Sequence, residues 1–253
     1  ANCAPVLLAC SIAGALPAGP WTAYGALAAG VALTVGALSS LVLPGRLRAS
    51  GLAPAIIGVS LGLFGLLSGT LGIQPERITA LLAALLLLAC LSIPWLAMAS
   101  TPVRVTGPSA AAQIDPRQID KSVSMGVSMS VSIRLGTCLA LVILTPILCS
   151  TSQGIVLSAL IGAALMLSTR SIRSRVEVLI GVLSGMAVLA WAAYAAALQS
   201  ATSLLLVLVT SLTGSLLVLA TNVVTPKTRP WLSRTADTIS TLVIIAVPPF
   251  ALY

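Results

Sequence analysis

The residues able to bind or react are few in this sequence, and they gather near its middle. The segment QIDPRQIDKS, residues 113–122, contains two aspartates, one arginine and one lysine within an otherwise almost entirely apolar chain. The other carboxylates are Glu76, Glu177 and Asp237, and none of them lies in the middle of an apolar run. The central segment is therefore the first candidate for contact with a partner.

The usual requirements for catalysis or metal binding are missing. The chain has no histidine, which removes the commonest general base and metal ligand. We find no phosphate-binding loop, nucleophile elbow or zinc-protease motif. The 5 cysteines show no C-x-x-C spacing and are typical of small buried hydrophobic residues. The sequence predicts no catalytic residues, no metal site and no cofactor.

The composition is that of an integral membrane protein. Hydrophobic residues make up 58% of the chain and charged residues 7%, against about 25% charged residues in soluble domains. The apolar runs are about twice as long as the segments of a β-barrel, so we expect an all-α fold. A net charge of +8 would suggest nucleic-acid binding in a soluble protein, but here it indicates topology. We expect no nucleic-acid partner.

The chain divides into two helical bundles joined by a polar connector. A helix needs about 20 apolar residues to cross the membrane. Nine segments qualify: 1–17, 21–43, 51–73, 77–99, 134–150, 153–168, 176–198, 202–222 and 236–253. The prediction is a polytopic transmembrane bundle with four spans in residues 1–99, a connector at 100–133 and five spans in 134–253.

The basic residues predict the orientation of these spans. Alternate loops carry 12 of the 13 Lys and Arg residues, and Arg77 is the exception. Because positive charge accumulates on the cytoplasmic side, we expect the N-terminus inside, the C-terminus outside and a cytoplasmic connector. Glu177 and Asp237 each open a span at that face, where a carboxylate complements the helix dipole and can pair with nearby arginines. The sequence begins at Ala1 within an apolar run, so we expect further sequence before it.

Small residues form stripes on the second and third spans. In the third, glycines recur at helical spacing, and in the second, small residues follow a similar spacing. Such stripes let helix backbones approach closely. The glycines assigned to helix packing are Gly25, Gly36, Gly58, Gly62, Gly65 and Gly69. The alternative is that glycine and alanine are simply frequent in membrane helices.

The connector contains a helix start. Asp115, Pro116 and Gln118 match an N-cap, a first-turn proline and a capping partner. The next residues also alternate as in a strand, but a lone strand would have no sheet to join, so we predict a short cytoplasmic helix. The residues assigned to partner contact are Asp115, Arg117, Asp120, Lys121, Met125, Met129 and Arg134. A solvated linker is the alternative.

The order of these parts resembles EccD, the membrane subunit of type VII (ESX) secretion. The likeness rests on the connector with QIDPRQID, on five spans after it, and on the C-terminal stretch TPKTRPWLSRTADTISTLVIIAVPPFALY. Family members carry a ubiquitin-like domain and eleven spans, so this sequence resembles the third to the eleventh. The resemblance implies a homodimer that encloses a lipid-lined vestibule in the inner (plasma) membrane. It also implies EccB, EccE and the EccC ATPase as partners, with the connector contacting the ATPase.

A small-molecule permease or secondary transporter is the second hypothesis. It rests on the prolines near span ends and on hydroxyl groups within spans, such as Ser60, Ser68 and Thr70. Carboxylates deep in the membrane, which proton-coupled carriers use, are not predicted.

Overall fold

The apolar runs fold as helices, and glycine, proline and a hydroxyl cap mark several of their ends. In the computed structural model, the described residues are 23–40, 51–70, 72–100, 116–169, 174–199 and Thr238. The helices are α2 (Ala23–Ser40), α4 (Leu52–Thr70), α5 (Pro75–Ser100), α7 (Pro116–Leu148), α8 (Ser152–Ser168) and α9 (Arg175–Gln199). These ranges contain no strand, as the all-α prediction requires.

Tight turns reverse the chain between neighbouring helices. Gly72, between α4 and α5, has a φ of 60°, a conformation that glycine adopts without steric cost. Thr151 caps α8 by accepting a hydrogen bond from the Gly154 amide at 3.1 Å. A Cβ on Gly154 would lie 2.8 Å from the carbonyl carbon of Leu148. A glycine at this position therefore lets α8 begin directly against the end of α7.

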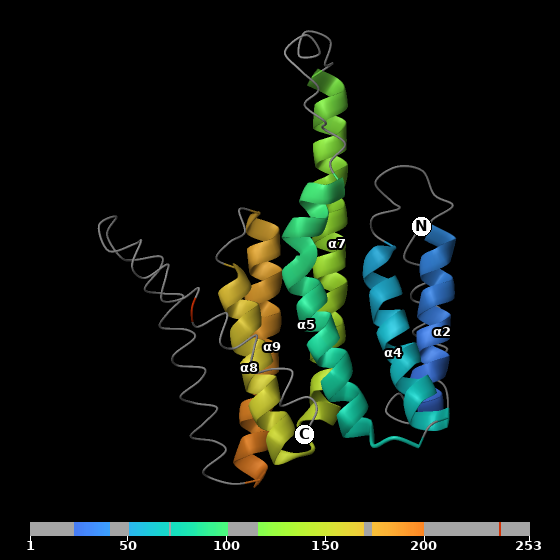
Figure 1. Ribbon diagram of the computed structural model, residues 1–253, viewed down its shortest axis with the longest axis vertical. Helices are drawn as coiled ribbons and strands as arrows, with labels where there is room; N and C mark the ends of the chain where they lie inside the picture. Colours follow the sequence, from blue (N-terminus) through green and yellow to red (C-terminus); the bar gives the residue numbers. More distant parts are fainter. Residues whose placement is uncertain are drawn as a thin grey trace, which may run out of the picture.

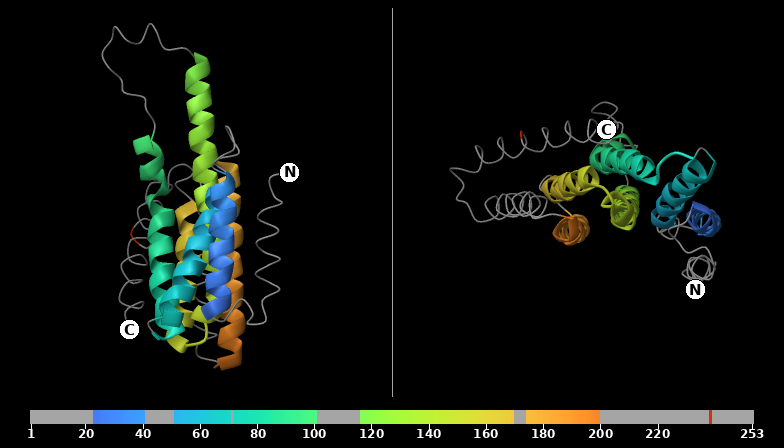
Figure 2. Two further views of the ribbon diagram at one scale, coloured as in Figure 1. Left: turned by 90° about the vertical axis from the view of Figure 1, so that its right-hand side faces the viewer. Right: turned by 90° about the horizontal axis from the view of Figure 1, so that it is seen from below.

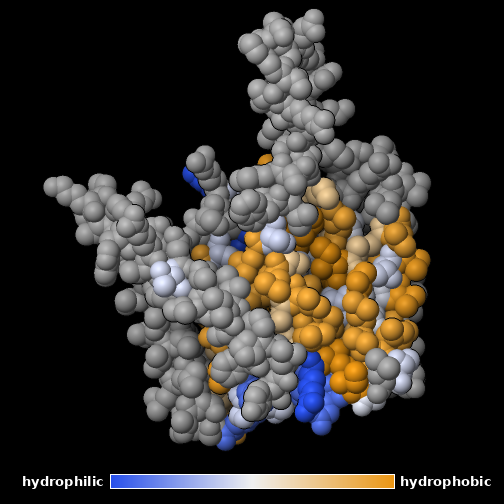
Figure 3. All heavy atoms as spheres, in the orientation of Figure 1, coloured by the Kyte–Doolittle hydropathy of each residue, from blue (hydrophilic) through white to orange (hydrophobic). Residues whose placement is uncertain are grey.

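Four of the described helices are long and apolar enough to cross a membrane. Their qualifying stretches are Leu52–Thr70, Pro75–Ile93, Gly126–Leu148 and Arg175–Gln199. The apolar helix α8 is shorter, at 17 residues. Figure 3 shows hydrophobic surface over the described helices at the centre and right of this view, α5, α4 and α2. The predicted segments 1–17, 202–222 and 236–253 lie outside the described helices, so the count of nine spans stays a prediction.

Helix α7 is at the centre of the arrangement. It contacts α4, α5, α8 and α9, and it lies between the α2–α4 pair and the α8–α9 pair (Figures 1 and 2). It is continuous over 33 residues, so the predicted connector helix and the fifth span are one helix, with no break near residue 133. Its N-terminal part extends beyond the neighbouring helices (Figure 1).

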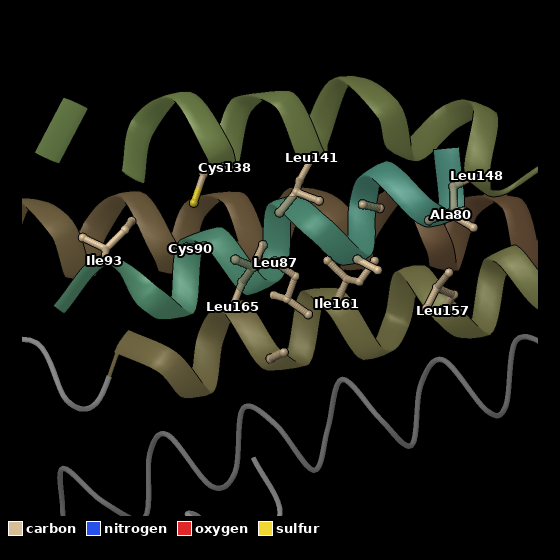
Figure 4. Close-up of a cluster of buried hydrophobic side chains, with 13 residues drawn as sticks. Ala80, Leu87, Cys90, Ile93, Cys138, Leu141, Leu148, Leu157, Ile161 and Leu165 are labelled. Carbon is tan, nitrogen blue, oxygen red and sulfur yellow. The ribbon is translucent and has the colours of Figure 1, made fainter. Parts of the chain in front are cut away.

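The main apolar core joins α5, α7 and α8 (Figure 4). Leu87 of α5, Leu141 of α7 and Leu165 of α8 are each at most 2% exposed. Cys90 and Cys138 belong to the same cluster and are free thiols, as predicted for cysteines that act as small apolar residues. This core fixes α7 against its neighbours and so fixes the direction in which its N-terminal part projects.

Candidate functional site

A polar cluster lies where α7, α8 and α9 meet, within the otherwise apolar bundle. We call it the Arg134 cluster and define it as Ser130 and Arg134 of α7, Ser168 of α8, and Glu177 of α9. Arg134 falls inside the membrane-spanning stretch Gly126–Leu148. Charged residues at such positions are rare and often functional, so this cluster is the candidate site of the described chain.

Arg134 is almost completely enclosed. Its side chain is 2% exposed, and its Nη2 donates a hydrogen bond to the Ser168 hydroxyl at 3.0 Å. Its Nε is buried and has no hydrogen-bond partner within the described part of the chain. A buried donor without a partner costs free energy, and the cost is larger on a charged group. The guanidinium is therefore incompletely satisfied in this conformation.

A glycine on α9 makes room for the guanidinium. A Cβ on Gly181 would lie 3.0 Å from Nη2 of Arg134 and 2.5 Å from the Cγ2 atom of Thr169. A larger residue there would displace Arg134 or the end of α8. Gly181 therefore belongs to the wall of the Arg134 cluster.

Glu177 joins α9 to α7. It lies in the first turn of α9, as predicted, but its side chain is 8% exposed and accepts a hydrogen bond from the hydroxyl of Ser130. The predicted pairing with nearby arginines is not what the structure describes: Arg175 is exposed and Arg173 lies outside the described residues. The carboxyl group of Glu177 faces the neighbouring helix instead.

Polar contacts also join the helices at the opposite end of the bundle. Gln199, at the end of α9, donates through Nε2 to the carbonyl oxygens of Cys149 and Ser150, at 3.3 and 3.2 Å. The hydroxyl of Ser150 donates to Glu76 at 3.5 Å. These contacts are exposed or partly buried, whereas Arg134 is enclosed. The Arg134 cluster thus differs from an ordinary polar helix end.

The predicted contact residues have different positions. Asp115 lies outside the described residues. Arg117, Asp120, Lys121 and Met125 fall within the backbone of α7, but their side chains are outside the described part. Met129 is 43% exposed on α7. These positions share the N-terminal part of one helix.

Arg134 is enclosed, unlike Met129. Its burial places it inside the bundle of this chain, and its assignment to partner contact stays a prediction. Arg134 is the first residue of the predicted span 134–150, so the sequence pattern places it at the boundary of the connector. Ser168 and Gly181, which enclose it, come from distant positions in the sequence.

A second feature is the close approach of α2 and α4 at a glycine seam. A Cβ on Gly30 would lie 2.5 Å from Cα of Gly62 and 2.7 Å from the carbonyl oxygen of Gly58. A Cβ on Gly58 would lie 2.8 Å from the amide nitrogen of Thr34. The two backbones therefore approach closely at Gly58 and Gly62, two of the glycines assigned to packing.

For the remaining glycines of the stripes the packing role stays a prediction. Gly65 is buried, whereas Gly69 is exposed. The burial of Gly25 and Gly36 is outside what the structure describes. The sequence pattern does not single out Gly30, because the predicted stripe runs through Gly25 and Gly36, on a different face of the helix.

No group of three or more His, Cys, Asp or Glu side chains lies together among the described residues. The hydroxyls of Ser60 and Ser68 each donate to backbone carbonyls of their own helix. The Arg134 cluster can hold a buried charge and join α7, α8 and α9. These are structural roles.

The helices assign the described part of the chain to a class of protein, and a family comparison then assigns the chain to a family. The described part of the chain is a polytopic helical membrane protein. The family described as the EccD-like transmembrane domain matches residues 1–253. The chain belongs to the EccD family, and the resemblance inferred from its sequence is confirmed.

A solved structure has a similar fold. It is described as protomer 1 of the ESX-3 core complex, with a TM-score of 0.70 and 15% sequence identity. The alignment covers 99% of this chain and 60% of that chain. At this identity the likeness concerns the fold alone, and the chain spans about 60% of the length of the matched protein. The search of curated proteins gives no match.

Proposed function

We propose that this chain is a structural membrane subunit of a type VII (ESX) secretion complex. The observation that carries the proposal is the family match over residues 1–253. The similarity in fold to a protomer of the ESX-3 core complex supports it. The enclosed, largely apolar cores agree with a role in which helices are packed rather than substrates converted.

The proposal assigns partner docking to the N-terminal part of α7. This part carries Arg117, Asp120 and Lys121 and precedes the membrane-spanning stretch, which starts at Gly126. Exposed Val127 and Met129 continue the surface toward the membrane, and methionine suits adaptable contacts. The partner is a cytosolic ATPase subunit, the EccC ATPase of the family resemblance, and EccB and EccE complete the complex.

The proposed membrane role follows from the lipid-exposed faces. Large apolar side chains on α9, such as Leu179, Leu183 and Tyr194, are 58–60% exposed. We assign such faces to membrane lipids and to a second copy of the chain. Paired copies would enclose a lipid-lined vestibule in the inner membrane.

Co-purification from native membranes tests the docking role. We call residues 116–125, the part of α7 before the membrane-spanning stretch, the α7 extension. The double variant R117E/K121E reverses two charges on this extension and is expected to lose most of the bound ATPase subunit. The matched control is Arg77→Glu, because Arg77 is an exposed cation at the start of α5, on the predicted opposite side. Equal amounts of each variant in the membrane show that insertion is intact. If R117E/K121E retains the ATPase at the parental level, α7 is not the docking element.

One observation favours the permease as a second candidate. Arg134 is an ionisable residue enclosed within a spanning helix, a position common in transport pathways. Purified protein in liposomes would then move a solute down its gradient, and Arg134→Gln would abolish that movement. The absence of flux for the parent across a broad solute panel would exclude this function.

A further inference from the structure

Two pairs of residues set the relative positions of α7 and α9. Ser130 contacts Glu177, and four residues further along each helix Arg134 lies against Gly181. Equal steps in the same direction mean that the two helices run parallel here, with α8 as the return segment. Four residues correspond to a rise of about 6 Å. The backbone positions of Arg134 and Glu177 are therefore about one helical turn apart along this interface.

The described hydrogen bonds of Glu177 and Arg134 are made with neutral groups rather than with an opposite charge. Glu177 takes its described hydrogen bond from a neutral hydroxyl, and Arg134 donates to another neutral hydroxyl while its Nε has no partner among the described residues. A buried charge is stabilised best by an opposite charge with good hydrogen-bond geometry. Glu76, the other carboxylate whose side chain the structure describes, lies at the opposite end of the bundle beside Ser150. Among the described carboxylates, Glu177 is therefore the one that shares an interface with Arg134.

Ser130 is the α7 residue that bonds the carboxyl group of Glu177. It lies four residues inside the stretch that begins at Gly126, at the base of the α7 extension. Movement of that extension would strain the Ser130–Glu177 bond before it strained the apolar core around Leu141. Release of Glu177 would free its carboxyl group for the long and flexible side chain of Arg134.

We propose that Arg134 and Glu177 form a two-position latch between the α7 extension and the α8–α9 pair. In the described position, Ser130 holds Glu177 and Ser168 holds Arg134. In the second position, the Ser130 bond is broken and Arg134 pairs directly with Glu177. The latch rests on the proposed function, because it gives the docking helix two defined positions on the bundle. Arg134 and Glu177 are positioning residues in this account.

A double-mutant cycle measured in two backgrounds tests the latch. Arg134→Gln, Glu177→Gln and the double variant are made in the full-length protein, once with Ser130 and once with Ser130→Ala. Unfolding equilibria are measured in mixed detergent micelles. With Ser130 present, we expect the coupling of Arg134 to Glu177 to change the unfolding equilibrium by less than about threefold. With Ser130→Ala, we expect about tenfold or more, the scale of a charged hydrogen bond. Equal coupling in both backgrounds would overturn the latch.

Hydrogen exchange provides a second readout that does not require the Arg134 variants to fold. Ser130→Ala alone is expected to raise amide exchange at residues 116–130 of α7 by about tenfold. The matched control is Ser68→Ala in α4, because the Ser68 hydroxyl is also partly buried but bonds the backbone of its own helix. Exchange in α7 that is equal in S130A and S68A contradicts the proposal. Neither measurement involves the ATPase, so failure of the latch and failure of docking are distinguishable.

Discussion

Gly30 of α2 and Gly62 of α4 lie back to back, yet their tolerance of a side chain is unequal. A Cβ on Gly30 would lie 2.5 Å from Cα of Gly62, whereas a Cβ on Gly62 would lie 3.8 Å from Cα of Gly30. The first distance is a backbone clash and the second is ordinary contact. The close packing of α2 against α4 therefore depends more on Gly30 than on Gly62.

Substituting these two glycines should give different results. Gly30→Ala is expected to destabilise the protein by about 1–3 kcal/mol, because two backbones must separate to admit the methyl group. Gly62→Ala is the matched control and should leave stability nearly unchanged. Thermal unfolding in mild detergent measures both. Equal stability of the two variants would show that α2 and α4 do not approach as described.

A similar comparison applies within α7. A Cβ on Gly136 would lie 2.8 Å from both Cα and the carbonyl oxygen of Ala53, whereas nothing lies within 4 Å of a Cβ on Gly126. Gly136→Ala should therefore move α7 away from α4 at a cost of about 1–3 kcal/mol. Gly126→Ala should be neutral, or stabilising by up to about 1 kcal/mol through helix propensity. Stability in detergent is again the measurement, and a harmless Gly136→Ala would contradict the α4–α7 contact.

The core cluster can be tested with two leucines of α5. Leu87 is 1% exposed and packs against α7 and α8, whereas Leu85 is 55% exposed on the same helix. Leu87→Ala leaves a cavity and should cost about 2–5 kcal/mol. Leu85→Ala removes a side chain that faces lipid and should cost far less. If both variants unfold together, Leu87 is not part of a packed interior.

Cysteine labelling in intact cells tests the predicted orientation. In a background with the five native cysteines replaced, Lys121→Cys should react with a membrane-impermeant maleimide only after the cells are opened. Gln74→Cys is exposed in the turn before α5 and should react from outside. The positive-inside rule is the reason for this assignment. The reverse pattern, with Lys121→Cys labelled from outside, would end the docking proposal as well as the topology.

Helix positions were predictable because each apolar run is long and has a local end signal. The expected spans 51–73 and 176–198 correspond closely to α4 and α9. Pro116 is the first described residue of α7, and its predicted N-cap, Asp115, lies outside the described residues. Such signals involve residues that are close in the sequence, so the sequence alone predicts the helix ends.

The contacts of the candidate site could not be predicted in the same way. Arg134 is enclosed by Ser168, 34 residues away, and Ser130 meets Glu177 across 47 residues. Neither spacing has a periodic signature. The seam of α2 shows the same limit: its buried positions include Ala26, Leu33 and Ala37, one step of about 100° from the stripe through Gly25 and Gly36.

The continuity of α7 has a mechanical consequence. Its 33 residues span about 50 Å, well beyond the roughly 30 Å of the hydrocarbon layer, and its internal proline, Pro146, comes two residues before its end. A helix without an internal break is stiff along its length. A force applied to its N-terminal end would therefore reach the membrane-spanning helices as a change of tilt, with little of it lost to bending.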